Sequence, residues 1–191
     1  ERSDLNVYKQ EFAIDTDQRT LADAMKDADV FIGVSGANLV SADMLASMAD
    51  HPIVFALSNP DPEISPGLAH EVRKDIIMAT GRSDFPNQIN NVLGFPFIFR
   101  GALDVRARSI NAAMQIAAVE GLRALTHEPV LPEILEAYQL KQLEFSPDYI
   151  IPKPFDPRLM DFVPPAVAQA AVDSGVARGG FPKHYRPAPH L

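Results

Sequence analysis

Short apolar runs mark the strand candidates in the first part of the chain. Val30–Val34, Ile53–Leu57 and Ile76–Ala79 contain no polar side chain, which is typical of strands in a parallel sheet covered by helices. We expect the middle run to be the central strand, with both faces buried. Asn59 and Pro60 follow it directly and favour a turn, so Ser58 and Asn59 are expected at the carboxyl edge of the sheet.

Segments around these runs have the spacing of amphipathic helices. Helices are predicted at Thr20–Ala28, Ser41–Ala49 and Leu68–Arg73, the first with Thr20 or Asp17 as N-cap and the second with Ser41. Strands that alternate with helices pair in parallel through right-handed crossovers. The G-x-G-x-x-G fingerprint of the first half of a dinucleotide-binding domain is absent. The sequence therefore predicts an α/β fold that is the second half of a doubly wound, Rossmann-type sheet.

Prolines change the character of the chain near residues 126–132. Eleven of the 17 prolines lie between Pro129 and Pro189. We therefore expect a partial NAD(P)-binding domain at residues 1–128, a helical, proline-rich C-terminal wrap at 129–178 and a disordered tail at 179–191. Further helices are predicted at Phe95–Arg106, Ile110–Leu125, Pro132–Leu140 and Phe162–Ala177.

Composition excludes several classes of protein. The net charge of −8 and the pI near 5.0 argue against nucleic-acid binding, which needs clustered Lys and Arg. The chain has no cysteine, which fits a cytoplasmic protein and rules out thiolate chemistry. No apolar stretch approaches the roughly 20 residues of a membrane span, so we expect no membrane partner.

Amides and glycines at strand ends are the candidate binding residues. Asn59, Asn90 and Asn91 could each donate to a carboxylate or accept from a carboxamide. Turn and helix-cap roles explain the same residues equally well. The turn Gly33, Val34, Ser35, Gly36 follows a strand and could run alongside a bound cofactor. An ordinary strand-to-helix turn also accounts for these residues.

Other charged residues have simpler structural interpretations. The five histidines show no metal-ligand spacing. Lys153 lies between two prolines and is interpreted as a rigid surface lysine. Asp61, Glu63 and Asp84 could add negative charge near the cleft, although turn roles explain them as well. No nucleophilic triad, paired carboxylates or metal site is visible in the sequence.

Four separated motifs resemble the carboxyl half of a malic enzyme: Ala28–Ser35, Ile53–Pro60, Asn90–Pro96 and Tyr149–Leu159. The last is similar to the bacterial branch of that family, including its longer hybrid forms. The resemblance covers about Tyr8–Arg178 and fades beyond it.

The resemblance implies NAD(P)-dependent oxidative decarboxylation of malate to pyruvate and CO₂, with Mg²⁺ or Mn²⁺ as the metal cofactor. It also implies that the enzyme is an oligomer. It implies that Asn59 contacts malate and cofactor, that Asn91 binds malate, and that Asn90 and the Gly33–Gly36 turn lie beside the cofactor. NADP is the expected cofactor. The family's catalytic Tyr and Lys, its carboxylate metal ligands and its glycine-rich loop are expected upstream of Glu1, so the chain alone should be inactive.

Two other classes remain open from the sequence. A non-catalytic, truncated Rossmann module could act through self-association or through a partner that covers its unpaired sheet edge. Another Rossmann dehydrogenase would carry a basic residue at the substrate edge, and the three asparagines argue against it.

Overall fold

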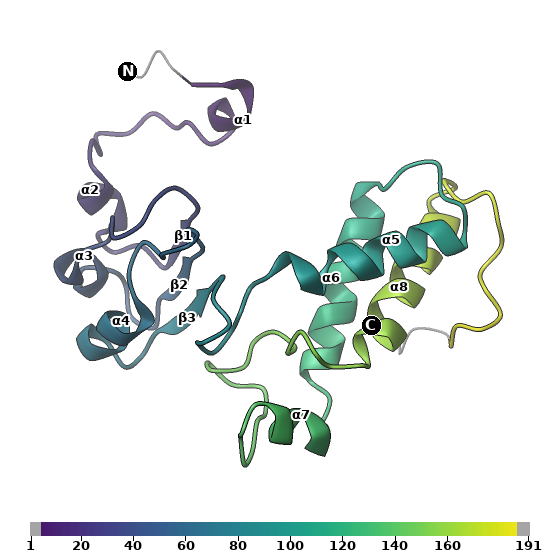
Figure 1. Ribbon diagram of the computed structural model, residues 1–191. Helices are drawn as coiled ribbons and strands as arrows, with labels where there is room; N and C mark the ends of the chain where they lie inside the picture. The colour runs from purple at the N-terminus through teal and green to yellow at the C-terminus, as the bar shows by residue number, and fades with distance from the viewer. Residues whose placement is uncertain (1–4, 187–191) are drawn as a thin grey trace.

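The computed structural model describes residues 5–186 (Figure 1). Its sheet has three strands in the order β1-β2-β3, and both neighbouring pairs are parallel. The strands are β1 (Val30–Gly33), β2 (Ile53–Ala56) and β3 (Ile77–Thr80). This order and direction confirm the predicted α/β fold with half of a doubly wound sheet.

Four short helices accompany the sheet: α1 (Val7–Gln10), α2 (Leu21–Met25), α3 (Ala42–Ala46) and α4 (Pro66–Val72). Thr20 begins α2 as predicted, because its hydroxyl accepts from the backbone N–H of Asp23 at 3.1 Å. The Asp23 carboxylate accepts in return from the Thr20 N–H at 2.9 Å, which completes a capping box. Ser41 caps α3 with its hydroxyl alone, which accepts from the Met44 N–H at 3.2 Å.

Helices cover only one face of the sheet (Figure 1). Val54, Ala56 and Met78 face the helices and belong to a buried apolar cluster. Residues of the opposite face are more exposed, with Val30 at 50% and Ile32 at 62%. Ile53 and Phe55 are only partly buried there. The prediction that β2 is buried on both faces is therefore wrong for this structure, since its two residues on the second face stay partly exposed, although Ala79 of β3 is fully buried on that face.

The remaining elements form a helical lobe, residues 91–178. They are η1 (Asn91–Leu93), α5 (Phe95–Asp104), α6 (Ala112–Thr126), α7 (Pro132–Ala137) and α8 (Leu159–Asp173). Glycines let α8 approach its two neighbours closely: a Cβ at Gly101 would lie 2.5 Å from the Pro164 carbonyl oxygen, and one at Gly121 would lie 3.0 Å from that of Phe162. The predicted C-terminal end of α8 at Ala177 is late, because Gly175 leaves the helix with a φ of 73°.

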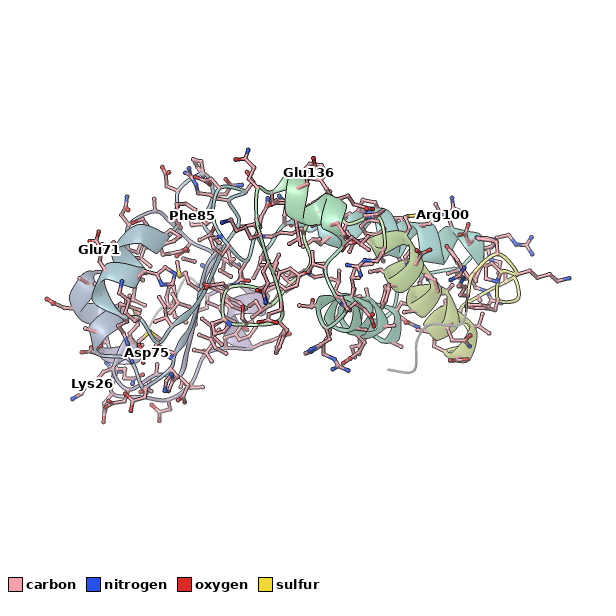
Figure 2. All side chains as sticks on the ribbon, turned by 90° about the horizontal axis from the view of Figure 1, so that it is seen from below. Lys26, Glu71, Asp75, Phe85, Arg100 and Glu136 are labelled. Carbon is pink, nitrogen blue, oxygen red and sulfur yellow. The ribbon has the colours of Figure 1, made fainter. Side chains whose placement is uncertain are left out.

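Two separate cores follow from this arrangement. One lies between the sheet and α2–α4, in what we call the sheet lobe (residues 20–80), and the other lies among α5, α6 and α8. Figure 2 shows Lys26, Glu71 and Asp75 on the sheet lobe and Arg100 at the far end of the helical lobe. The sheet core ends at Met78 and the helical core begins at Leu93. The boundary expected from the prolines, near Glu128, separates different parts of the chain.

Residues 179–186 are packed, which differs from the disorder expected from Gly179 onward. The Gly179 N–H donates to the Val105 carbonyl at 2.9 Å. Phe181 and Tyr185 pack against the helical core, and the Tyr185 hydroxyl donates to the Asp104 carboxylate. Apolar side chains therefore hold this proline-rich and glycine-rich stretch in place. The rest of the expected tail, residues 187–191, lies outside the described residues.

Candidate active-site edge

The carboxyl ends of the three parallel strands form one edge of the sheet. Gly33, Ala56 and Thr80 are paired across neighbouring strands at this end. The binding residues suggested by the sequence lie at the end of β1, in the loops that follow the strands, or at the start of η1. Ligands bind at this edge in open α/β sheets, so the strand register places the candidate site here.

Glu63 joins the ends of β1 and β2. It is 1% exposed, and its two carboxylate oxygens accept from the Ser35 N–H at 3.0 Å and the Ser58 N–H at 3.1 Å. A Cβ on Gly33 would lie 2.4 Å from the Glu63 carboxyl carbon, so glycine is required for this approach. Glu63 thus fixes the two loops relative to each other. The sequence left Glu63 open between a charge near the cleft and a turn role, because no local pattern shows which distant amides a buried carboxylate will meet.

The proposed cofactor turn is partly occupied by the protein itself. Gly33 is buried against Glu63, and the Ser35 N–H is used by the same carboxylate. Val34 is 77% exposed, and Gly36 is partly exposed. Gly33 and the Ser35 N–H therefore shape the turn, while Val34, Ser35 and Gly36 present surface that a ligand could contact.

Asn59 lies on the surface directly after β2. Its side chain is exposed and makes no hydrogen bond within residues 5–186, and its peptide bond to Pro60 is cis. The amide is therefore available to a ligand at the carboxyl edge. On the neighbouring loop, Arg82 donates to the Asp84 carboxylate at 2.8 and 2.9 Å, which lowers the pKa of Asp84.

Asn90 and Asn91 lie together, beyond β3. The Asn90 side chain accepts from the Val92 N–H at 3.0 Å and caps η1, as the structural interpretation of the sequence expected. Both asparagines line a small, largely apolar cavity of about 320 Å³ with Phe95 and Ile151. Asn59 is not among the residues that line it, so the structure joins two of the three amides in one cavity.

Asn87 is a structural amide that the sequence analysis did not single out. It is 2% exposed and donates to the Met78 carbonyl at 2.9 Å and the Pro147 carbonyl at 2.7 Å. Its oxygen accepts from the Ile150 N–H at 2.9 Å. These bonds attach the segment after α7 to the sheet. Its sequence context, a polar loop rich in amides, could not distinguish it from Asn90 and Asn91.

Lys153 also differs from its interpretation as a surface lysine, because it is only 8% exposed. Its ammonium lies 5.1 Å from the centre of the Tyr138 ring. Burial lowers the pKa of Lys153. A position between two prolines predicts a fixed backbone but not the direction of the side chain.

Neither a metal centre nor a membrane helix is found in the part of the chain that the structure describes. No group of three or more His, Asp or Glu side chains is placed to hold a metal ion. The helices within residues 5–186 are all too short or too polar to cross a bilayer. The acidic side chains of these residues therefore do not fit a divalent metal, and no chemistry is assigned to one here.

Comparison with known proteins gives a consistent result. The family profile described as "Malic enzyme, NAD binding domain" matches residues 2–141. An NADP-dependent malic enzyme of Halomonas elongata is 63% identical over 184 residues, covering 96% of this chain and 44% of the relative. An NADP-dependent malic enzyme of Rhizobium meliloti is 57% identical, with coverage of 91% and 23%. The chain thus spans less than half the length of these curated relatives.

Solved structures agree with these sequence relatives. The crystal structure of a malic enzyme from Pyrococcus horikoshii matches with a TM-score of 0.70 and 42% identity, over 84% of this chain and 34% of that one. An NAD-dependent malic enzyme from Thermotoga maritima matches with a TM-score of 0.67 and 37% identity, over 87% and 39%. A profile match over most of the chain, close relatives and the parallel sheet together show that this chain belongs to the malic enzyme family.

Proposed function

We propose that this chain is part of an enzyme that oxidises and decarboxylates malate with NADP. The similarity to relatives named NADP-dependent malic enzymes, at up to 63% identity, carries this proposal. NAD is the alternative cofactor, because a Rhizobium meliloti relative named NAD-dependent is 49% identical. In the reaction, hydride leaves C2 of malate for the nicotinamide, a carboxylate leaves as CO₂, and the products are pyruvate, CO₂ and NADPH.

The carboxyl edge offers polar groups suited to both ligands. Asn59 has an exposed amide without a hydrogen-bond partner among residues 5–186, and this amide can accept from a nicotinamide carboxamide and donate to a malate carboxylate. Asn91 is the second malate-binding candidate, and its side chain is exposed beside Asn90. Asn90 is the cofactor-side residue, since its oxygen is already engaged by Val92 and its NH₂ group can still donate.

The turn after β1 is the proposed path of the cofactor. Val34, Ser35 and Gly36 present its accessible surface, whereas Gly33 and the Ser35 N–H hold its shape through Glu63. A fixed turn costs less entropy when a ligand binds than a mobile one does. The buried Glu63 carboxylate therefore acts as a positioning group for the cofactor-binding and malate-binding loops.

The exposed edge and second face of the sheet support an association with further structure. Val30, Ile32 and Val34 leave an apolar strip along β1, and an unpaired parallel edge is normally covered. We propose that additional strands of the same domain pair with β1, and that the assembled protein is cytoplasmic and oligomeric. Catalytic acid–base groups and metal ligands then come from outside this chain.

A chimera tests the proposal directly. The chain replaces the matching 184 residues of the Halomonas elongata relative, and NADPH formation is followed with malate and Mg²⁺. We expect activity in the chimera and a loss of kcat/KM of at least about 100-fold for Asn59→Ala and Asn91→Ala, as for other groups that orient a substrate. Gln142→Ala is the matched control, since Gln142 is an exposed amide away from this edge.

Two results would overturn the assignment. A folded chimera that reduces neither NADP nor NAD with malate would exclude malate oxidation by this chain. Equal activity of the Asn59→Ala, Asn91→Ala and Gln142→Ala variants would exclude the two proposed malate-binding residues. Sedimentation of the 191-residue chain then tests the alternative of a non-catalytic module, which requires tight self-association without nucleotide binding.

A further inference from the structure

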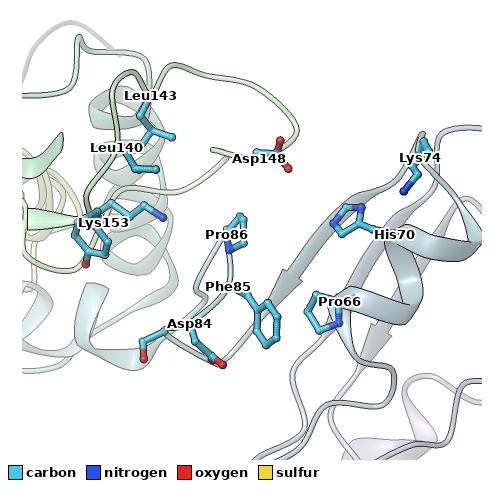
Figure 3. Close-up of a pocket in the computed structure, with 13 residues that line it drawn as sticks. Pro66, His70, Lys74, Asp84, Phe85, Pro86, Leu140, Leu143, Asp148 and Lys153 are labelled. Carbon is cyan, nitrogen blue, oxygen red and sulfur yellow. The ribbon is translucent and has the colours of Figure 1, made fainter. Parts of the chain in front are cut away.

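A cavity of about 780 Å³ lies between the sheet lobe and the segment that follows α7. Figure 3 shows Pro66 and His70 of α4 on one side, Phe85 and Pro86 at the centre, and Leu140, Leu143 and Lys153 on the other. Ligand pockets in proteins typically have about 300–1,000 Å³ and mostly apolar walls with a few polar groups. The volume and the lining of this cavity both fit that description.

Lys153 is a buried charged group for which the residues lining this cavity provide no counter-ion. The side chain is more than nine-tenths buried, and no carboxylate within residues 5–186 lies within 4 Å of its ammonium. Its nearest electrostatic partner is the Tyr138 ring, 5.1 Å away. Figure 3 shows the amine directed into the cavity. A buried ammonium without a counter-ion is costly, so an anion gains from contact with it.

Two partly buried arginines show the contrast. Arg73 pairs with Asp75 at 2.6 Å, and Arg158 pairs with Asp156 at 2.7 Å. Each guanidinium has a carboxylate supplied within two residues along the chain. Lys153 has no such partner, which suggests that its counter-ion comes from elsewhere.

Charges around the cavity favour an anion near Lys153. His70 of α4 and the exposed Lys74, two residues beyond the end of that helix, contribute further basic groups. Asp84 is engaged by Arg82 at 2.8 Å, so its charge is largely balanced. Asp148 is exposed at the rim and makes no ion pair with Lys153. The buried part of the cavity therefore keeps a positive charge.

We propose that this cavity binds a small organic anion with an apolar body, whose carboxylate or phosphate group accepts from the Lys153 ammonium while its body packs against Tyr138, Phe85 and Leu143. The asparagines of the active-site edge do not line this cavity. The ligand is therefore an additional one, beyond malate and NAD(P). The site spans two segments that Asn87 joins, so binding there also links the sheet lobe to the helical lobe.

Calorimetric titration of the 191-residue chain tests the site with three probes: phenylacetate, phenyl phosphate and the neutral phenylacetamide. The anions are expected to bind with a submillimolar Kd and at least about tenfold more tightly than the amide, the range of a charge-assisted hydrogen bond. Comparing the carboxylate with the phosphate shows which head group the cavity prefers. Neither malate nor NADP is present, so the outcome is independent of the proposed reaction.

Variants locate the effect on one side chain. Lys153→Met keeps the length and apolar stem, and we expect it to lower the affinity for both anions at least about tenfold while leaving phenylacetamide unchanged. Lys141→Met is the matched control, because Lys141 is an exposed lysine outside this cavity. Methyl NMR of the unsubstituted chain gives a second measurement: phenyl phosphate should shift Leu140 and Leu143 and leave Leu103 unchanged.

Three outcomes would refute the proposal. The first is no detectable binding of either anion at 10 mM, a concentration about tenfold above the weakest expected Kd. The second is equal affinity for anion and amide, or for the Lys153→Met and Lys141→Met variants. The third is binding that shifts Leu103 rather than Leu140 and Leu143, which would place the probe on the exposed face of α5.

Discussion

Replacing Tyr149 by phenylalanine removes an oxygen atom that the fold buries without a partner. Tyr149 is 1% exposed, and its hydroxyl makes no hydrogen bond within residues 5–186. An unsatisfied buried hydroxyl costs about 1–3 kcal/mol, so we expect Tyr149→Phe to raise the free energy of unfolding by about 1 kcal/mol at pH 7. The usual result for a buried tyrosine is the opposite, because its hydroxyl normally has a partner.

The same substitution changes the alkaline stability of the protein. Burial, followed by the nearby charge of Asp156, raises the pKa of Tyr149 from 10.0 to about 12. The unfolded chain therefore releases this proton first, and folding stability falls as the pH rises from 10 to 12. A shift of two units corresponds to about 2.7 kcal/mol in full, of which about 1.4 kcal/mol is lost by pH 11. Phenylalanine has no such loss.

Urea unfolding at pH 7, 9 and 11 measures both effects. The difference between Tyr149→Phe and the unsubstituted chain should grow by about 1.4 kcal/mol between pH 9 and 11, since the other titrating groups are common to both proteins. Tyr185→Phe is the control: its hydroxyl donates to Asp104, so its loss should destabilise the protein by about 1 kcal/mol at pH 7. Destabilisation by Tyr149→Phe at pH 7, or a constant difference across pH, would refute the reasoning.

Three further substitutions test the contacts that hold the site together, each by urea unfolding. Asn87→Ala removes three hydrogen bonds of a buried amide and should cost about 2–4 kcal/mol; a loss below about 0.5 kcal/mol would contradict this. Asp156→Ala leaves the Arg158 guanidinium unpaired and should cost about 3–5 kcal/mol, and recovery in the Asp156→Leu, Arg158→Met double variant is the control. Gly33→Ala pushes its Cβ into Glu63 and should cost about 1–3 kcal/mol in the unsubstituted chain, and clearly less when it is introduced into the Glu63→Ala variant; an equal cost of Gly33→Ala in the two backgrounds would argue against the clash.

Local chemistry along the chain determined the elements of the fold. The apolar runs at Ile53 and Ile77 form strands, and Thr20 and Ser41 begin helices, because strand pattern and capping depend on residues a few positions apart. The same local patterns placed Asn59, Asn90 and Asn91 in loops after strands. The family resemblance added their roles, which stay predictions here.

Only the tertiary structure decided which side chains meet. Glu63 is hydrogen-bonded to Ser35, 28 residues away in the sequence, and Asn87 to Pro147, 60 residues away. No local sequence pattern predicts either hydrogen bond. Lys153 was interpreted as a surface residue because its prolines fix the backbone, while the fold of two distant segments buried its ammonium. Secondary structure follows from short-range periodicity, so the sequence by itself determined the helices and strands. Burial and charge pairing depend on which distant segments pack together, so only the tertiary structure decided them.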